Sequence, residues 1–313
     1  MTVNVAYACD DAYIEQTSVS LISLFENNKD VDEIVIYFIN MGINDESKAY
    51  LNELVHSYNR IIHIIDFDEI AFDLNVNSTG RHTKSVYAKF FFGRINDIDR
   101  IIYLDSDIVV NDSIVPLWTT ELDGCICAGV ETLHSADDNI AMGLNEDTKA
   151  INDGMVLMDL QAWRNNNCLE NCLRFINDFD GEPPVLSEGT INNVLLGRIK
   201  IIHPRYNLMS GIVNAKQRKI EVLTGRDYYS QKQLDEASNN PCIIHYLSGF
   251  YNRPWCSNCS HPLKNIYLMY REKTKWSDTP LVEKKLPVRL KMIGYAYRYL
   301  PIHIFVWLRT IVK

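Results

Sequence analysis

Short apolar runs alternate with longer amphipathic runs along the first hundred residues, and this alternation limits the folds open to the chain. The apolar runs cover residues 3–8, 34–39, 61–65 and 101–104, and the amphipathic runs cover residues 15–26 and 46–58. The short runs have the length and composition of buried strands, whereas the long runs have helical periodicity. Because strands that alternate with helices form a mostly parallel sheet, we expect an α/β fold with a twisted, Rossmann-like sheet flanked by helices.

Acidic residues directly follow two of the expected strands. Asp10 and Asp11 come after the first strand, and Asp105-Ser106-Asp107 comes after the strand that ends at Leu104. In open parallel sheets the ligand crevice lies off the carboxyl ends of the strands. Residues i and i+2 of an extended chain point the same way, so this D-x-D triplet presents two convergent carboxylates, which suit Mg²⁺ or Mn²⁺. The alternative is a turn or a helix cap made by short polar side chains.

The overall composition is close to the average for a soluble globular protein. The chain has 313 residues, of which 47% are hydrophobic and 23% charged. At this length it builds either one large α/β domain with a small appendage or two domains. The formal net charge of −9 argues against a nucleic-acid partner, and an acidic substrate would need local basic groups or a metal ion.

The eight cysteines are scattered along the chain, which is typical of reduced thiols in a cytoplasmic protein rather than of a disulfide framework. Cys256 and Cys259 form a C-x-x-C motif, but a zinc site would want a second close pair nearby, so ordinary thiols are favoured. The first eight residues lack the basic and long apolar regions of a signal peptide, and we expect the chain to start with a strand.

Six segments resemble, in the same order, the motifs of glycosyltransferase family 8, over roughly residues 3–260. They are residues 6–13 (AYACDDAY), 81–89 (RHTKSVYAK), 103–110 (YLDSDIVV), 151–160 (INDGMVLMDL), 187–192 (SEGTIN), and His245-Tyr246 followed by Arg253-Pro254-Trp255. The family contains retaining enzymes, among them bacterial lipopolysaccharide galactosyl- and glucosyltransferases. The resemblance implies a GT-A catalytic domain over residues 1–260, a UDP-hexose donor carrying glucose or galactose, and a glycan acceptor.

The resemblance also implies that His245 completes a metal site with Asp105 and Asp107. Mn²⁺ or Mg²⁺ held there would neutralise the diphosphate leaving group as a Lewis acid. Taken alone, a histidine after an apolar run is more often a satisfied core residue. The aspartate pair and the downstream Arg-Pro-Trp favour the metal-ligand interpretation instead.

Contacts with the donor are implied for residues from every motif. The implied residues are Ala8, Asp10, Asp11, Tyr13, His82, Lys89, Asp105, Ser106, Asp107, Asn152, Gly154, Ser187, Gly249 and Arg253. Asp10 would accept a hydrogen bond from the uracil or the ribose, whereas Asp11 could equally cap the following helix. Lys89 stands where the family usually has arginine and would reach the diphosphate or the sugar. His82 is either close to the sugar or a solvated loop residue. Arg253 would bind the diphosphate from a closing segment, the alternative being an ordinary surface loop.

The implied catalytic residues are Asn152, Asp153 and Glu188. Asp153 departs from the family pattern, and its carboxylate would bind sugar hydroxyls or point to solvent. Ser187 replaces an expected carboxylate, and Glu188 replaces an expected amide. Glu188 is either the nucleophile of a double displacement, a positioning group, or a first-turn helix residue favoured by the helix dipole. We favour front-face attack, in which the leaving diphosphate takes the acceptor proton.

The tail after Glu283 contains seven basic residues and no acidic residue, interleaved with aromatic and aliphatic side chains. It is too short and interrupted for a clean membrane span, but it suits an anionic membrane surface. We therefore expect residues 261–313 to form a small helical extension that attaches a cytoplasmic enzyme to the inner face of the cytoplasmic membrane, close to a lipid-linked acceptor. The alternative is a pair of helices packed on the catalytic domain.

These features together predict a metal-dependent retaining hexosyltransferase of lipopolysaccharide or other cell-surface polysaccharide synthesis. Two other classes stay open. A haloacid-dehalogenase-like phosphohydrolase also places D-x-D after an apolar strand, although His245 and Arg253 would then have no role. A non-catalytic nucleotide-sugar-binding protein associated with the membrane would explain the departures at Ser187 and Asp153.

Overall fold

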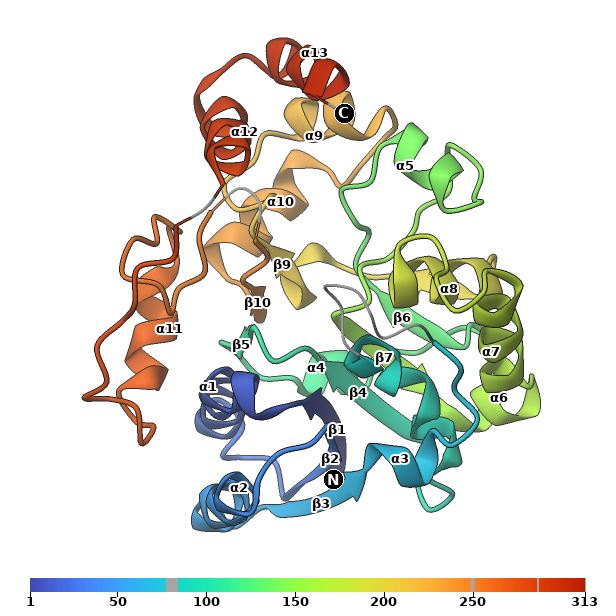
Figure 1. The fold of residues 1–313 in the computed structure, drawn as a ribbon, viewed down its shortest axis with the longest axis vertical. Coiled ribbons are helices and arrows are strands. Elements are labelled where there is room, and N and C mark those ends of the chain that lie inside the picture. The colour runs from blue at the N-terminus through green and yellow to red at the C-terminus, as the bar shows by residue number, and fades with distance from the viewer. Residues whose placement is uncertain (77–83, 249–250, 286, 313) are drawn as a thin grey trace.

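A seven-stranded sheet forms the centre of the molecule in the computed structural model, which describes residues 1–76, 84–248, 251–285 and 287–312 (Figure 1). The strand order is β3–β2–β1–β4–β7–β6–β8. The strands are β1 (Thr2–Cys9), β2 (Glu33–Asn40), β3 (Ile61–Asp66), β4 (Arg100–Leu104), β6 (Cys127–Gly129), β7 (Met155–Asp159) and β8 (Ile199–Ile201). β7 runs antiparallel to both of its neighbours, and the other pairings are parallel. The expected mostly parallel sheet is confirmed.

The strand β1 shows how alternating side chains build two cores. Val5 and Tyr7 belong to the cluster that also contains Ile22 of α1 (Ile14–Glu26). Ala6 belongs to a second cluster on the opposite face, with Phe90 and Trp163. Successive residues of a strand point to opposite faces of the sheet, so an all-apolar strand needs helices on both sides.

The remaining helical segments cover these faces and fill the connections. They are α2 (Asp45–Ser57), α3 (Phe67–Ile70), η2 (Lys84–Arg94), α4 (Val115–Trp118), α5 (Ala136–Ala141), α6 (Leu160–Asn165), α7 (Cys168–Asp178), α8 (Leu186–Val194), α9 (Gln217–Thr224) and α10 (Gln231–Asn239), with 3-10 turns at η1 (Asp11–Tyr13) and η3 (Pro204–Tyr206). The α2 helix begins where the sequence predicts, because the Asn44 side chain caps the backbone N–H of Ser47 at 2.9 Å.

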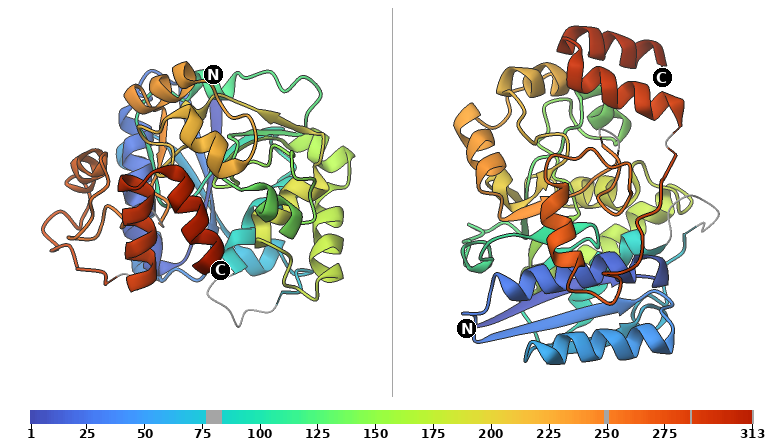
Figure 2. Two further views of the ribbon diagram at one scale, coloured as in Figure 1. Left: turned by 90° about the horizontal axis from the view of Figure 1, so that it is seen from above. Right: turned by 90° about the vertical axis from the view of Figure 1, so that its left-hand side faces the viewer.

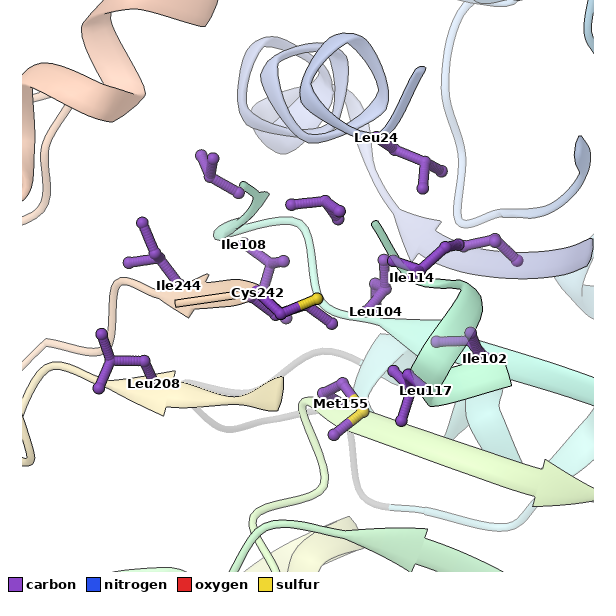
Figure 3. Packing of buried hydrophobic residues seen from close by; sticks show 14 of the residues in the cluster. Leu24, Ile102, Leu104, Ile108, Ile114, Leu117, Met155, Leu208, Cys242 and Ile244 are labelled. Atoms are coloured by element: carbon purple, nitrogen blue, oxygen red, sulfur yellow. The ribbon is translucent and has the colours of Figure 1, made fainter. Parts of the chain in front are cut away.

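A second, three-stranded sheet lies beside the carboxyl end of β4. It consists of β5 (Ile108–Val110), β10 (Ile243–His245) and β9 (Leu208–Met209), in the order β5–β10–β9. Figure 3 shows the apolar side chains packed where this sheet meets the central one, among them Leu104, Ile108, Leu208 and Ile244. Because β4 and β5 belong to different sheets, the three residues between them sit at the junction.

The C-terminal part consists of α11 (Lys264–Arg271), α12 (Val288–Tyr299) and α13 (Ile302–Val312). The α11 helix packs against α1, whereas α12 and α13 lie at one end of the molecule next to α9 (Figures 1 and 2). Tyr297 and Phe305 are buried in a small cluster with Leu223 of α9. In the part of the chain described here, no helix is long and apolar enough to cross a bilayer. The expected boundary at residue 260 stays a prediction.

Candidate active site

Asp105, Asp107 and His245 converge at the junction of the two sheets. His245 Nε2 lies 3.0 Å from Asp107 Oδ1 and 3.9 Å from Asp105 Oδ2. One ligand atom from each of the three residues lies within 4.8 Å of the other two. The register of β10 against β5 explains the proximity, because His245 pairs with Ile108, the residue after the D-x-D triplet. The structure thus brings together three side chains that are far apart in the sequence.

The ring of His245 is oriented by an amide. Its Nδ1 lies 3.0 Å from Asn207 Oδ1, so an Nδ1–H donates to that oxygen and the Nε2 lone pair faces the carboxylates. Burial lowers the pKa of His245, which favours the neutral imidazole. Nε2 is buried and has no hydrogen-bond partner among the described residues. Two carboxylates and a neutral, oriented imidazole fit a divalent metal ion.

Gly154 is required by the close approach of the backbone to this site. A Cβ atom on Gly154 would lie 2.6 Å from Asp105 Oδ2 and still nearer to His245 Cε1. The Gly154 carbonyl also accepts a hydrogen bond from the Asp105 backbone N–H at 2.8 Å. Any side chain at this position would displace two of the candidate metal ligands.

A chain of hydrogen bonds leads from His245 to Glu188. Asn207 Nδ2 donates to Asn152 Oδ1 at 2.9 Å, and Asn152 Nδ2 donates to Glu188 Oε2 at 2.8 Å. Glu188 is buried, and this burial, followed by the negative charge of Asp153, raises the pKa of Glu188 to about 8. The candidate metal site and Glu188 are therefore parts of one network.

The two departures from the family pattern, Asp153 and Ser187, are in direct contact. Ser187 Oγ donates to Asp153 Oδ2 at 2.6 Å. The same carboxylate oxygen lies 2.8 Å from Lys89 Nζ, which also donates to the Asp153 carbonyl at 2.8 Å. Lys89 lies over the ring of Tyr103, 4.7 Å from its centroid, and the Tyr103 hydroxyl donates to Asp105 Oδ1 at 2.8 Å. The buried ammonium of Lys89 thus has a buried counter-ion.

Ser187 and Glu188 occupy the first turn of α8, as the helix-dipole interpretation of Glu188 predicts. The backbone before them adopts the left-handed region, with φ of 54° at Val185 and 52° at Leu186. A β-branched residue in this region is uncommon and costs free energy, and such strain clusters at functional sites. The turn directs the start of α8 toward Asn152 and Asp153.

At the end of β1, the helix-capping role falls on Asp10 and not on Asp11. Asp10, expected to bind the nucleoside rather than to cap a helix, accepts from the Ala12 backbone N–H at 3.1 Å and caps η1. Asp11, for which capping was an open alternative, instead accepts from the Asn44 side chain at 2.7 Å. A short side chain before a tight 3-10 turn is well placed to cap it, which explains the difference. Ala8 is buried at the end of the same strand.

The segment around Arg253 returns to the D-x-D triplet. The Arg253 guanidinium forms an ion pair with Asp107 Oδ2 and donates to the Tyr246 carbonyl at 2.6 Å. Its guanidinium carbon lies 5.3 Å from the ring centroid of Trp255, whose ring meets that of Tyr13 edge-on at 6.4 Å. The segment therefore connects the metal-site carboxylates with the first turn after β1.

Three other residues were expected to contact the donor, namely Ser106, His82 and Gly249. Ser106 is buried and its hydroxyl accepts from Thr17 Oγ1 at 2.9 Å, so it joins the triplet to α1. His82 and Gly249 lie outside the described residues.

Sequence reasoning missed two side chains that belong to this network. Asn207 orients His245, and His134 places Nε2 at 3.0 Å from Glu188 Oε1. Neither residue lies in a recognisable motif, and each comes from a connection far from its partner in the sequence. The one sequence signal for Asn207 and His134 is their residue type, an amide and a histidine that lie near strands.

Comparison with known proteins identifies the family. The sequence profile described as "Glycosyl transferase family 8" matches residues 4–259. General stress protein A of Bacillus subtilis is 28% identical over 280 residues, which are 88% of this chain and 95% of that protein. Lipopolysaccharide 1,2-glucosyltransferase of Escherichia coli is 23% identical over 296 residues, covering 92% of this chain and 83% of that protein.

The fold is also shared with solved structures. A crystal structure of the galactosyltransferase LgtC in complex with donor and acceptor sugar analogues matches with a TM-score of 0.69 and 18% identity, covering 93% of this chain and 99% of that chain. At this identity the likeness speaks for the fold, which is the GT-A fold that the motif resemblance implied. Since the family profile spans most of the chain, the protein belongs to glycosyltransferase family 8 and is a glycosyltransferase.

Proposed function

We propose that this glycosyltransferase is a metal-dependent, retaining enzyme that transfers glucose or galactose from a UDP-hexose to a glycan acceptor. The observation that carries the proposal is the buried Nε2 of His245, which has no hydrogen-bond partner within the described ranges and faces Asp105 and Asp107 while Asn207 contacts the other ring nitrogen. Most buried polar side-chain atoms have a hydrogen-bond partner, so a ring nitrogen that lacks one and faces two carboxylates is available to a metal ion. A lone pair aimed at two carboxylates is what a Mn²⁺ or Mg²⁺ ligand set requires.

Asp105, Asp107 and His245 would hold the metal ion, which when bound supplies Lewis-acid stabilisation of the diphosphate leaving group. Arg253 would bind the diphosphate oxygens through its guanidinium, since it already lies beside Asp107. Ala8, Asp10, Asp11 and Tyr13 would line the nucleoside site at the end of β1. Ser106 would act through the backbone, because its hydroxyl is engaged by Thr17.

In the proposed front-face reaction, the bond between the anomeric carbon and the diphosphate oxygen breaks as the acceptor oxygen forms a bond to that carbon on the same face. The acceptor proton passes to the leaving diphosphate oxygen, so no carboxylate nucleophile is needed. Glu188 would place negative charge near the anomeric carbon, because Asn152 fixes one of its oxygens. The contact of Ser187 and Lys89 with Asp153 supports a role for this carboxylate at the sugar hydroxyls.

The acceptor is proposed to be a bacterial cell-surface glycan that is linked to a lipid. The support is the likeness to a lipopolysaccharide 1,2-glucosyltransferase, together with the basic, aromatic tail. Membership of glycosyltransferase family 8 leaves the phosphohydrolase alternative without support.

We also propose that the α12–α13 extension attaches the enzyme to an anionic membrane surface. Four exposed apolar side chains recur on one face of α12, namely Val288, Met292, Tyr295 and Tyr299. Their spacing of four, three and four residues places them on one side of the helix. Basic residues flank this face, at Lys284, Lys285, Arg289 and Lys291. An apolar helix face surrounded by positive charge is complementary to anionic lipid.

The test is release of free UDP from a panel of UDP-glucose, UDP-galactose and a GDP-sugar, with Mn²⁺, with Mg²⁺ and with a chelator. We expect metal-dependent release from one of the two UDP-hexoses. Asp105→Asn, Asp107→Asn and His245→Ala should each abolish it, whereas Asp30→Asn, at an exposed aspartate outside the site, should not. Activity that is undiminished by chelator, or that survives any two of the three site changes, would contradict the metal-dependent mechanism.

A further inference from the structure

His134 lies beside Glu188, although the two come from different parts of the fold. His134 precedes α5, and its Nε2 is 3.0 Å from Glu188 Oε1, with side chains 22% and 12% exposed. Glu188 Oε1 is buried and has no aligned hydrogen bond within the described chain, so a protonated His134 would meet it as an ion pair. The other oxygen, Oε2, accepts from Asn152.

A buried network fixes the backbone that carries His134. Arg226 donates to the His134 carbonyl at 2.9 Å and, through Nε, to Glu131 Oε1 at 3.0 Å. Glu131 and Arg226 are both buried within this ion pair. The Tyr228 hydroxyl donates to the Glu131 carbonyl at 2.6 Å, and the Tyr229 hydroxyl accepts from the Glu131 N–H at 3.0 Å. The segment is therefore held in place independently of α8, and the contact with Glu188 does not depend on a loose surface loop.

Charged groups from several elements surround the Glu188 carboxylate. Asp153 follows Asn152 in the turn before β7, Lys89 comes from η2, His245 from β10 and His134 from the segment before α5. Lys89 already forms the ion pair with Asp153, and the His245 ring is engaged with Asn207. Of these groups, His134 is the one whose ring nitrogen contacts Glu188 directly.

We propose that His134 is a positioning residue for sugar transfer: as an imidazolium it holds Glu188 in the charged form, so that Glu188 presents negative charge to the anomeric carbon. This inference rests on the proposed function and deepens it. Burial and Asp153 raise the pKa of Glu188 to about 8. An imidazolium at 3.0 Å would act in the opposite direction, because an opposite charge favours the ionised carboxylate.

Replacing His134 with alanine should change how sugar transfer depends on pH. Removing the positive charge raises the pKa of Glu188 further, so the pH at which activity rises moves upward. For a shift of about one pKa unit, His134→Ala lowers kcat about tenfold on the acid side of this rise, and the loss recovers at high pH. The donor KM and the metal-dependent affinity for UDP stay unchanged, because the contacts of His134 given above are with Glu188 and Arg226, and neither of these residues is proposed to bind UDP or the metal ion.

The experiment measures kcat and donor KM against pH for wild type, His134→Ala, His134→Lys and Glu188→Gln, with UDP binding in the presence of Mn²⁺ and a melting curve for each. His134→Lys keeps a cation and should restore the wild-type pH profile at least in part. Glu188→Gln has no carboxylate to titrate, so its lower activity should be flat over the same range.

Lys149→Gln is the matched control for loss of one positive charge. Lys149 Nζ lies 4.0 Å from Glu131 Oε2 and its side chain is 52% exposed. It faces the same network without contacting Glu188, and its loss should leave the pH profile as in wild type. An equal shift in this variant would overturn the specific role of His134.

Two other results would also overturn the inference. The first is a His134→Ala profile that superimposes on wild type. The second is a variant that loses UDP binding or thermal stability along with activity, which would make His134 a purely structural residue. A wild-type protein that binds no UDP with Mn²⁺ and consumes no UDP-hexose would overturn the proposed function, and this inference with it.

Discussion

Asn207 and His245 form a 3.0 Å contact between Oδ1 and Nδ1 that decides which ring nitrogen faces the aspartates. The Asn207 amide is itself oriented, because its Nδ2 donates to Asn152. Such outer partners fix the tautomer and the orientation of a ligating histidine. Asn207 thereby contributes to the site without touching its centre.

Replacing Asn207 with leucine should weaken metal-dependent UDP binding by about 10- to 100-fold, because the oxygen that accepts from Nδ1–H is lost while side-chain size is nearly kept. Isothermal titration of UDP, with and without Mn²⁺, measures this effect. Asn207→Asp keeps an acceptor and serves as the matched comparison. Equal metal-dependent affinity for wild type and Asn207→Leu would show that Asn207 does not orient a ligand.

Gly154→Ala should abolish metal-dependent UDP release while leaving most of the fold intact. The added methyl group would collide with Asp105 and His245, so the ligands must separate. Overpacking of this kind typically costs 1–3 kcal/mol, on the order of a shift of several degrees in melting temperature. Gly42→Ala is a control for glycine loss, because a Cβ there meets nothing within 4 Å, although its positive φ adds some strain. An active Gly154→Ala variant would contradict the geometry of the site.

Glu188→Gln should retain measurable transfer and should stabilise the folded protein more at pH 8 than at pH 5. The pKa of Glu188 is raised to about 8 in the fold from an ordinary value of 4.5. Between pH 4.5 and about pH 8, Glu188 is therefore ionised in the unfolded chain but still protonated in the folded chain. Because the folded state binds the extra proton, the unfolding free energy of the wild type falls as pH rises across this window. The glutamine variant escapes this loss.

Denaturant titrations of wild type and Glu188→Gln at several pH values measure the difference between their unfolding free energies. We expect this difference to increase by on the order of a few kcal/mol from pH 5 to pH 8. A difference that is constant with pH would contradict the raised pKa. A dead glutamine variant, together with a glycosyl ester trapped on Glu188, would favour double displacement over front-face attack.

Asp153→Ala should be strongly destabilising, because it leaves the buried ammonium of Lys89 without its counter-ion. Loss of one partner of a buried pair typically costs 3–5 kcal/mol. The double variant Lys89→Met with Asp153→Ala removes both charges and should recover part of this loss. Chemical denaturation of the two single variants and the double variant gives the coupling energy. Strictly additive effects would mean that the pair does not act as a unit.

Removal of the chain after Pro280 should abolish most attachment to anionic vesicles while UDP binding persists. The lost segment carries seven basic residues, and each contributes about 1 kcal/mol near an anionic surface. Co-sedimentation with anionic vesicles at low and high salt measures the attachment, which should weaken as salt rises.

Truncation also removes Tyr297 and Phe305 from their packing on α9, so a gentler variant is needed as a control. Changing Met292, Tyr295 and Tyr299 to serine alters only exposed side chains and should reduce vesicle binding without aggregation. If all forms sediment equally with vesicles, the proposal of membrane attachment is wrong, and α12 and α13 only pack against the rest of the protein.

The sequence predicted the parts of the site that depend on local pattern. Asp105 and Asp107 could be found because they follow a buried strand with one residue between them, and the first strands and helices were placed to within one or two residues. His245 was reached only through the order of the family motifs, since nothing in its own surroundings separates a ligand from a core histidine.

The remaining contacts could not be predicted, because they join segments whose proximity is a property of the whole fold. Ser187 and Asp153 each depart from the family motif, and their side chains form a hydrogen bond with one another. The capping role fell on Asp10 rather than Asp11 because the first turn is a 3-10 turn, and its geometry follows from how β1 ends rather than from the residue types. Propensities describe single segments, whereas these contacts depend on how segments meet.

The ion pair between Arg253 and Asp107 has a consequence for the order of events in the site. The guanidinium is the counter-ion of a carboxylate that belongs to the candidate metal site. A divalent cation held through Asp107 Oδ1, the oxygen that faces His245, would share this carboxylate with Arg253 and weaken the ion pair, and the guanidinium would then be freer to bind the diphosphate. We therefore expect cation and nucleotide to bind with positive cooperativity, each raising the affinity for the other by the same factor. In an Arg253→Met variant, the cation alone should bind more tightly and the cooperativity should shrink.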